Sequence, residues 1–383
     1  MKIIYVSGTG VHDQRLYDKF SETGWEVHVV VLNRSRVGEV RGLTFHYLLS
    51  GASDYLLAKF PKAAKYTVRP IETVKDYFLL KALLRKIKPD ILHGTHVQST
   101  GFLCALTGYR PFLLVPFGSD ILRNPKKSKI HRMITEYSLR RADMIACDAE
   151  SVKREIVTLT DYPEEKIAVF PFGINLNRFN PDADGNAIRK RLEWEDKKIV
   201  IMTRSFRPVY GVEYFLRSIP DIIANVPEAR IMLCGSGLLE DEFKDFIDRE
   251  GLNTYVHFAG YVRNEELPDY LTAADVYVSS SLSDGTSLSL LEAQACGLPV
   301  VVSDVAANQE WVTDGVNGFI VPMRDSHKLS EKVIELLRDT ELRKRLGLKN
   351  IRIAQERANW DRNFEKFETI YQELIDRRLE RNC

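Results

Sequence analysis

The stretch from Val276 to Asp304 constrains the fold of this chain more than any other. It begins with a β-rich run over Val276 to Ser279 and continues through a polar loop into a helical pattern that ends at Cys296-Gly297. It closes with the apolar run Val300 to Val302. A strand, a loop, a helix and a second strand in this order predict a βαβ unit with two parallel strands. We therefore expect an α/β fold.

Two carboxylates lie in this stretch, Asp284 in the loop and Glu292 on the predicted helix, with seven residues between them. Ligands bind at the carboxyl ends of the strands in an open α/β sheet, and Asp284 follows such an end. The pair therefore marks a candidate binding site. A purely structural role fits the pair equally well, because an acid before a helix often only caps it, and a Glu in an apolar run can be buried and satisfied.

The composition is that of a soluble globular protein. The chain has 383 residues, of which 44% are apolar and 28% are charged, and this length favours about two or three domains. The five cysteines form no C-x-x-C pair and no Cys/His spacing typical of zinc, so we predict no metal site and a reduced, cytoplasmic compartment. The N-terminal apolar run is too short for a signal peptide, and no stretch approaches the roughly 18 apolar residues of a membrane span.

The net charge of +1 hides an asymmetry between the two halves of the chain. Residues 1–180 contain 27 Lys or Arg and 18 Asp or Glu, whereas the remainder contains 27 and 35. The basic first half favours an anionic partner or surface. Scatter of charges over a solvated surface explains the same counts. We predict no nucleic-acid partner.

The first half begins with a strand over Lys2 to Ser7, a turn with Gly8 and Gly10, and a helix from about His12. Such a turn allows a phosphate to approach the backbone at a helix N-terminus, which makes Gly10 a candidate contact. Asp13 occupies the third Gly position of the dinucleotide pattern G-x-G-x-x-G, and no acid ends the next strand. We therefore do not predict NAD binding.

Polar side chains follow two later strands of the first half. The strand that begins at Ile91 leads to His96, and the strand from Pro111 to Pro116 leads to Asp120. His96 and Asp120 are therefore candidate site residues, although a His at a strand end is more often a hydrogen-bonded structural residue.

Two segments of the first half, Lys59 to Arg69 and Arg123 to Arg132, combine basic with apolar or aromatic residues. Segments of this composition can lie on anionic lipid, so we predict peripheral contact with the inner face of the cell membrane. A solvated helix face is the alternative for both.

A polar linker from Leu176 to Lys198 separates the first half from a second half with the same alternation of strands and helices. After the first strand of the second half, Arg204 and Arg207 precede a helix, and Gly235 follows the next strand. Guanidinium groups and helix N–H groups together suit a diphosphate.

The segment from Asp284 to Val301 resembles the E-x7-E element of retaining glycosyltransferases of family 4, which reads roughly E-G-x-G/S-L-x-x-L-E-A-x-A-C/x-G-x-P-V-V. The resemblance covers nearly the whole chain and is stronger in the second half. Further matches follow in chain order: Asp90 to His93, Phe172-Gly173-Ile174-Asn175, Arg204, Gly235-x-Gly237, Gly260-Tyr-Val, Ala274-Asp275-Val276, Gly315-x-x-Gly318-Phe319 and Trp360.

The resemblance implies the GT-B fold, with two doubly wound Rossmann-like domains facing a central cleft. Residues 1–175, with a returning helix over about 360–383, would bind the acceptor, and residues 176–359 would bind the nucleotide sugar. The implied activity is that of a hexosyltransferase in polysaccharide or glycolipid biosynthesis. It would move a sugar from a UDP- or GDP-linked donor to a hydroxyl of a glycan or lipid-linked acceptor, with retention and without a metal or other cofactor.

The resemblance also assigns roles to residues. Arg204 would neutralise the charge that grows on the leaving diphosphate, Asp284 would hold a hydroxyl of the donor sugar, and Glu292 would accept hydrogen bonds from the ribose. We expect front-face attack, with the leaving phosphate helping to deprotonate the acceptor hydroxyl. The remaining donor-binding candidates lie at the helix start and in the base-binding loop: Gly285, Thr286, Ser287, Leu288 and Val262.

Three positions depart from the family pattern. Asp284 is one methylene shorter than the usual Glu, Tyr210 stands where a Lys is usual, and Phe117 stands where a His is usual. Arg207 is the candidate to replace the missing Lys charge, and His96 or Asp120 the candidate to take part of the role of the missing His. Two alternatives on the same fold remain open, a non-catalytic nucleotide-sugar-binding protein and a nucleotide-sugar epimerase.

Overall fold

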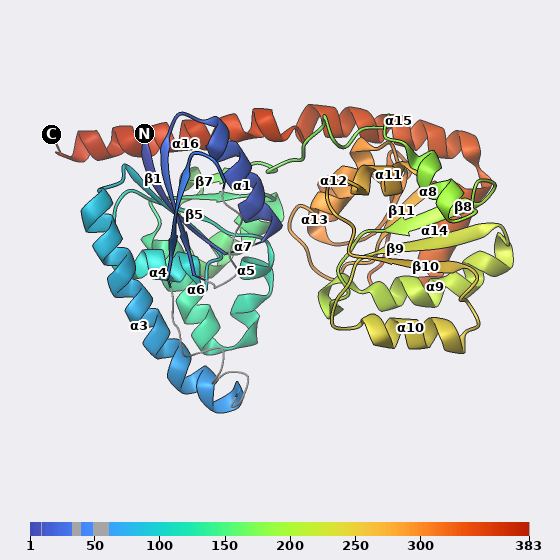
Figure 1. Ribbon diagram of the computed structural model, residues 1–383, viewed down its shortest axis with the longest axis horizontal. Helices are drawn as coiled ribbons and strands as arrows, with labels where there is room; N and C mark the ends of the chain where they lie inside the picture. The colour runs from blue at the N-terminus through green and yellow to red at the C-terminus, as the bar shows by residue number, and fades with distance from the viewer. Residues whose placement is uncertain (9, 33–39, 49–60, 383) are drawn as a thin grey trace. The chain divides into compact units, whose positions relative to one another are not determined.

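The computed structural model describes residues 1–8, 10–32, 40–48 and 61–382. The chain divides into two compact units, of which the first comprises Met1–Phe170 and Phe364–Cys383 and the second comprises Pro171–Asn363 (Figure 1). Each unit contains one parallel sheet with helices packed on its faces. This architecture confirms the prediction of two doubly wound Rossmann-like halves.

The sheet of the first unit has seven strands in the order β3-β2-β1-β4-β5-β6-β7. All neighbouring pairs are parallel. The order changes direction between β1 and β4, so the loops that follow these two strands diverge at that point. The strands are β1 (Lys2–Ser7), β2 (Glu26–Val31), β3 (Leu43–Tyr47), β4 (Ile91–Thr95), β5 (Phe112–Val115), β6 (Met144–Cys147) and β7 (Ile167–Val169).

The helices of the first unit fill the connections between these strands. They are α1 (Val11–Glu22), α3 (Pro61–Ile87), α4 (Thr100–Thr107), α5 (Ser119–Leu122), α6 (Lys129–Arg141) and α7 (Glu150–Thr160). Helix α3 begins at Pro61. Proline suits the first position of a helix, because its fixed φ is helical and its missing N–H would have no partner there.

The C-terminal helix α16 (Trp360–Asn382) contributes its later part to the first unit. Its buried aromatic stripe contacts the core of that unit, where Phe364 lies against Phe20 and Trp25. The hydroxyl of Tyr371 hydrogen-bonds to Nδ1 of the buried His93, with 2.7 Å between the two atoms. The C-terminal segment is therefore an integral part of the first unit's core.

The sheet of the second unit has six strands in the order β10-β9-β8-β11-β12-β13, all parallel. Its order changes direction between β8 and β11. The strands are β8 (Lys198–Met202), β9 (Ala229–Cys234), β10 (Val256–Gly260), β11 (Val276–Ser279), β12 (Val300–Ser303) and β13 (Gly318–Val321).

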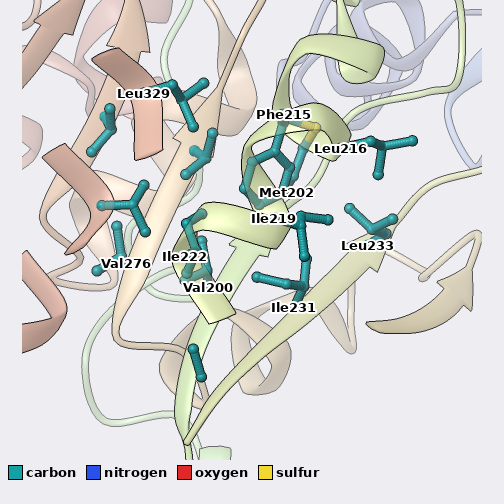
Figure 2. Packing of buried hydrophobic residues seen from close by; sticks show 14 of the residues in the cluster. Val200, Met202, Phe215, Leu216, Ile219, Ile222, Ile231, Leu233, Val276 and Leu329 are labelled. Atoms are coloured by element: carbon teal, nitrogen blue, oxygen red, sulfur yellow. The ribbon is translucent and has the colours of Figure 1, made fainter. Parts of the chain in front are cut away.

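Helices cover both faces of this second sheet. They are α8 (Gly185–Arg191), α9 (Val212–Asn225), α10 (Glu240–Arg249), α11 (Leu267–Thr272), α12 (Leu288–Ala295), α13 (Ala306–Gln309), α14 (Ser326–Arg338) and α15 (Thr340–Arg357). One apolar cluster lies under α9 and α14, and Figure 2 shows Val200, Ile219, Leu233, Val276 and Leu329 within it. A second cluster lies on the other face, under α11, α12 and α15. The central strands β8, β11 and β12 are mainly apolar because both faces are covered.

The predicted βαβ unit is present as β11, α12 and β12, with Val278 opposite Val301 in parallel register. Helix α12 is buried from Ser289 to Ala295. Gly297 follows it with a φ of +80°, a left-handed conformation that glycine adopts without strain.

The units change at Phe170/Pro171 and at Asn363/Phe364, a few residues from the predicted boundaries at 175 and 360. The backbone of Ile174 explains the difference, because its N–H donates to the carbonyl of Ala358 at 2.7 Å and its carbonyl accepts from the N–H of Trp360 at 3.0 Å. These bonds tie both crossing segments into the second unit. Among the helices of the described ranges, none is long and apolar enough to span a membrane.

Candidate functional site

The candidate site of the second unit lies at the carboxyl edge of its sheet, where the strand order changes direction. Arg204 follows β8, Asp284 lies in the loop after β11, and α12 begins next to that loop at Leu288. Because β8 and β11 are neighbours in the sheet, the two loops meet. This is the point at which open α/β sheets bind ligands.

Arg204 is the buried centre of this site. Its Nη1 donates to Oγ of Ser287 at 2.8 Å and to Oγ of Ser289 at 2.9 Å, and its Nη2 donates to Oγ of Ser281 at 3.1 Å. Nη2 also forms an ion pair with Asp284. The guanidinium is thus held in one orientation by groups that the sequence places far from it. Its Nε is buried and has no hydrogen-bond partner among the described residues.

Two tyrosines complete the surroundings of this guanidinium. Cζ of Arg204 lies 4.0 Å from the ring centroid of Tyr210, a cation–π geometry. The hydroxyl of Tyr277 donates to Oγ of Ser289 at 2.9 Å. Tyr210, at the position where the family usually has Lys, therefore packs on Arg204.

The ion pair of Arg204 and Asp284 is shielded from solvent. Burial raises the pKa of Asp284 above its ordinary value, although the positive charge of Arg204 opposes the rise. Burial lowers the pKa of Arg204, but the charges of Asp284, Tyr277 and Tyr210 bring the net pKa above its ordinary value. Arg204 therefore stays protonated and available to an anionic ligand.

The N-terminus of α12 lies beside Arg204. Oγ of Ser287 caps the helix by accepting from the N–H of Leu290 at 3.4 Å. Thr286 accepts from Nε1 of Trp311 at 3.4 Å, which fixes the preceding loop. Glu292 lies one turn into the same helix and is buried. The helix N-terminus and the guanidinium together form a positive surface that suits a diphosphate.

The loop after β9 closes against the loop after β8 at Gly235. A Cβ at Gly235 would lie 2.1 Å from the carbonyl oxygen of Arg204, so only glycine permits this approach. Arg207 is exposed, and Val262 is half-buried against the apolar cluster under α11 and α12. The structure thus brings Arg204, Asp284, Gly235 and the start of α12 together, and it leaves Arg207 at the surface.

A second set of predicted residues lies at the carboxyl edge of the first unit's sheet. His96 directly follows β4 with a φ of +50°, and its Nδ1 is 3.1 Å from Oγ1 of Thr95. The ring of Phe117 lies edge-on to His96, with centroids 5.0 Å apart, and stacks on His12 at 4.5 Å. A non-glycine residue in the left-handed region is uncommon, and such residues gather at functional sites.

Asp120 joins the two strand-end loops of this first-unit edge. Its Oδ2 accepts from the N–H of Val97 at 3.2 Å and from the N–H of Phe117 at 3.3 Å. Burial raises the pKa of Asp120, and His96 lowers it. Asp120 therefore has a structural contact to both loops, and His96 lies near enough to affect its charge.

Gly10 already has a partner within the chain. Its N–H donates to Oδ2 of Asp13 at 2.9 Å, while Oδ1 of the buried Asp13 accepts from the hydroxyl of Tyr5 at 2.7 Å. Asp13, at the third Gly position of the dinucleotide pattern, thus already accepts from the N–H that would donate to a phosphate. A phosphate contact at Gly10 would have to replace this hydrogen bond, and it stays a prediction.

Several residues around Arg204 have no counterpart among the predicted site residues, namely Ser281, Ser289 and Tyr277. The only signal for the two serines is the density of serine between Ser279 and Ser289. Of the two basic segments, Lys59 to Arg69 falls on residues whose side chains lie outside the described part of the chain. Within that described part, no group of three or more His, Cys, Asp or Glu residues could hold a metal ion.

Two family models match the chain. Residues 184–352 match the model for "Glycosyl transferases group 1", and residues 2–149 match the model for "Glycosyl transferase 4-like". An uncharacterized glycosyltransferase of Methanocaldococcus jannaschii is 24% identical over 377 residues, which cover 97% of this chain and 96% of the relative.

A curated relative from Escherichia coli bears the name UDP-Gal:alpha-D-GlcNAc-diphosphoundecaprenol alpha-1,3-galactosyltransferase. It is 26% identical over 300 residues, covering 76% of this chain and 77% of its own. Among solved structures, Anabaena HepE in complex with UDP and glucose has a TM-score of 0.80 at 18% identity, covering 98% of this chain and 100% of HepE. At that identity the likeness shows the fold.

Proposed function

The chain is a group 1 glycosyltransferase with the GT-B fold, and on that basis we propose that it moves a hexose from a nucleoside-diphosphate sugar to an acceptor hydroxyl. The observation that carries the proposal is the buried Arg204, held by Ser287 and Ser289 at the N-terminus of α12 and paired with Asp284. A fixed cation beside a helix N-terminus suits the charge that develops on a leaving diphosphate.

The second unit would bind the donor. The diphosphate would lie at the start of α12, on the N–H groups of Ser287 and Leu288 and close to Gly285, Thr286 and Gly235. The buried carboxylate of Glu292 would accept hydrogen bonds from the ribose hydroxyls, and the base would lie near Val262. We propose a UDP- or GDP-linked donor and would test UDP first, because the E. coli relative is named for UDP-galactose and the HepE structure holds UDP.

The reaction would proceed without a metal ion. Departure of the diphosphate leaves negative charge on its terminal phosphate, and Arg204 with the dipole of α12 would neutralise that charge. When the donor binds, before this departure, Asp284 would exchange its bond to Arg204 for a hydroxyl of the donor sugar. Arg207, exposed in the same loop, would add positive charge near the diphosphate.

Transfer would retain the configuration at the anomeric carbon. The bond to the leaving phosphate oxygen breaks as the acceptor oxygen bonds to the same face of the sugar, through an oxocarbenium-like transition state. The proton of the acceptor hydroxyl would pass to the departing phosphate, which gains basicity as it leaves. No protein nucleophile takes part in this front-face course.

The first unit would bind the acceptor, a glycan or a lipid-linked glycan. The E. coli relative is named for a diphosphoundecaprenol-linked acceptor, which motivates the lipid-linked class. His96 and Asp120 are the proposed polar groups of the first unit, and the uncommon backbone of His96 supports a functional role for it.

The first test measures UDP and GDP release from a panel of nucleotide sugars with glycan and lipid-linked acceptors. Nuclear magnetic resonance of the product would report the anomeric configuration. Glu292→Gln should weaken UDP binding by about 10- to 100-fold in calorimetry, because a charge-assisted hydrogen bond to the ribose is lost. The exposed Glu242→Gln on α10 is the matched control and should bind UDP like the wild type.

Four results would contradict the proposal. If no donor is turned over with any acceptor, the proposed transfer reaction is wrong. If Glu292→Gln binds UDP as tightly as the wild type, the proposed donor site is wrong. Loss of activity in a chelator, with recovery on adding Mg²⁺ or Mn²⁺, would contradict the proposal that the reaction needs no metal ion. Interconversion of the donor without an acceptor would instead indicate an epimerase.

A further inference from the structure

Helix α6 presents a row of apolar side chains to solvent. Ile130 and Met133 are each 68% exposed, and Tyr137 is 37% exposed. Residues three and four positions apart lie on one face of a helix, so the three side chains form a continuous row. Ser138 and Leu139 on the other face are buried against the unit. Exposed apolar rows of this kind mark interaction surfaces.

Basic side chains surround this row. Between Arg123 and Arg141 the chain has seven Lys or Arg residues and a single Glu. Lys126 is ion-paired with Glu155 and Arg132 with Glu136. The other five are exposed to solvent: Arg123, Lys127, Lys129, Arg140 and Arg141.

A second exposed apolar row lies on α3, where Val74 is 56% and Phe78 is 64% exposed. Both α3 and α6 pack against α4, so the two rows belong to the same layer of helices (Figure 1). Within this layer Phe102 of α4 contacts Tyr137 of α6, with 5.8 Å between the two ring centroids. We call the exposed faces of α3 and α6 with these side chains the basic-apolar face.

The basic-apolar face is tied to the predicted acceptor edge by Gln98. Its Nε2 donates to the carbonyl of Asp120 at 2.6 Å and to Oγ1 of Thr135 on α6 at 2.7 Å. Helix α6 runs from the carboxyl end of β5 back to the start of β6, so its first turn with Ile130 lies toward the edge that carries His96. A surface bound to α6 would therefore have a fixed position relative to that edge.

We propose that the basic-apolar face docks on an anionic lipid bilayer, with Ile130, Met133 and Phe78 inserted among the headgroups. Apolar side chains on a helix face, flanked by exposed Lys and Arg, match the requirements of a negatively charged lipid surface. A protein partner would be recognised by the apolar row alone, whereas the basic flanks favour anionic lipid. The purpose of the docking rests on the proposed function, since it would bring the acceptor edge to lipid-linked acceptors.

The test is co-sedimentation of the full chain with vesicles of mixed phosphatidylcholine and phosphatidylglycerol, and with pure phosphatidylcholine vesicles. The wild type should pellet with the anionic vesicles only, and less at high salt. Ile130→Ser with Met133→Ser, and separately Lys127→Glu with Lys129→Glu, should each lower vesicle binding at least tenfold. These side chains are exposed, so the variants should fold and bind UDP like the wild type.

Matched controls use equally exposed residues elsewhere. Leu348→Ser with Leu379→Ser removes side chains that are 61% and 59% exposed. Lys349→Glu with Arg352→Glu on α15 changes the net charge by the same amount as Lys127→Glu with Lys129→Glu. Both controls should sediment with anionic vesicles like the wild type. No pelleting of the wild type, equal pelleting with neutral vesicles, or wild-type binding by the α6 variants would overturn the proposal. UDP affinity, measured without vesicles, tests the proposed function separately.

Discussion

The observed role of Asp284 and its proposed role cannot be fulfilled at the same time. In the structure its carboxylate pairs with Arg204, and in the proposed donor complex it holds a sugar hydroxyl. The diphosphate would replace it as the anion beside Arg204. Removing the carboxylate should therefore affect both the positioning of the sugar and the balance of charge around a buried guanidinium.

Asp284→Asn should lower kcat by about 100-fold or more, the range seen when one group that stabilises the transition state is lost. Asp284→Glu keeps the charge and restores the length usual in the family, so it should stay within about tenfold of the wild type. Both are measured as steady-state UDP release with a saturating acceptor. Wild-type kcat in Asp284→Asn would show that Asp284 serves only as the partner of Arg204.

At the residue scale the sequence predicted positions better than partners. The structure confirms that Arg204 and Asp284 follow strands and that Glu292 lies on a helix, and the donor-binding roles of the three side chains stay predictions. The bonds from Arg204 to Ser287 and Ser289 could not be predicted, because they cross about 80 residues of chain and depend on how two loops meet. From the sequence, Tyr210 indicates only the absence of the usual Lys charge. Its ring contact with Arg204 depends on side-chain packing, which the sequence does not predict.

The hydrogen bond between His93 on β4 and Tyr371 on α16 is the clearest contact between two elements distant in sequence. Tyr371→Phe removes the hydroxyl and leaves Nδ1 of a buried imidazole without that partner, which should cost about 1–3 kcal/mol in the free energy of unfolding. Chemical denaturation measures the cost. Tyr261→Phe, at a residue 74% exposed, is the control and should leave stability unchanged. If Tyr371→Phe lowers the free energy of unfolding no more than Tyr261→Phe does, the hydrogen bond to His93 does not contribute to stability.

The same histidine should make stability depend on pH. Burial lowers the pKa of His93 from 6.5 to about 3. Between those values the unfolded chain binds a proton that the folded chain does not, so the free energy of unfolding should fall as pH drops from 6.5 toward 3. Above pH 6.5 this contribution is constant. In a denaturation series between pH 6.5 and pH 3, His93→Gln should reduce the slope of the free energy of unfolding against pH. An unchanged slope would show that other groups cause the pH dependence.

At the element scale, apolar runs predicted the strands to within about two residues. Parallel strands covered on both faces are continuous apolar runs, and Val300 to Val302 is an example. Helix α4 has no such signal, because its sequence Thr100–Thr107 is apolar on nearly all sides and lacks a helical period.

The described ranges of the chain contain two sheets, one in each unit, so unfolding of the whole molecule is not expected to follow a single two-state transition. We predict two calorimetric transitions. UDP should raise only the one that belongs to the second unit, by about 2.7 kcal/mol of stability when UDP is present at a hundred times its dissociation constant. Tyr371→Phe should lower the other transition and so assign it to the first unit. An equal shift of both transitions by UDP would contradict a donor site built from the second unit.

Asp13 has a consequence for how two similar halves divide their work. Both units have a parallel sheet whose strand order reverses, and each offers a helix after its first strand at that point. In the second unit Arg204 lies beside the start of α12, whereas in the first unit the N–H of Gly10 donates to the buried carboxylate of Asp13. We expect this acidic side chain to give the two halves unequal affinity for the same nucleotide. A single donor molecule would then be directed to one half, and the other half would keep its edge for a different substrate.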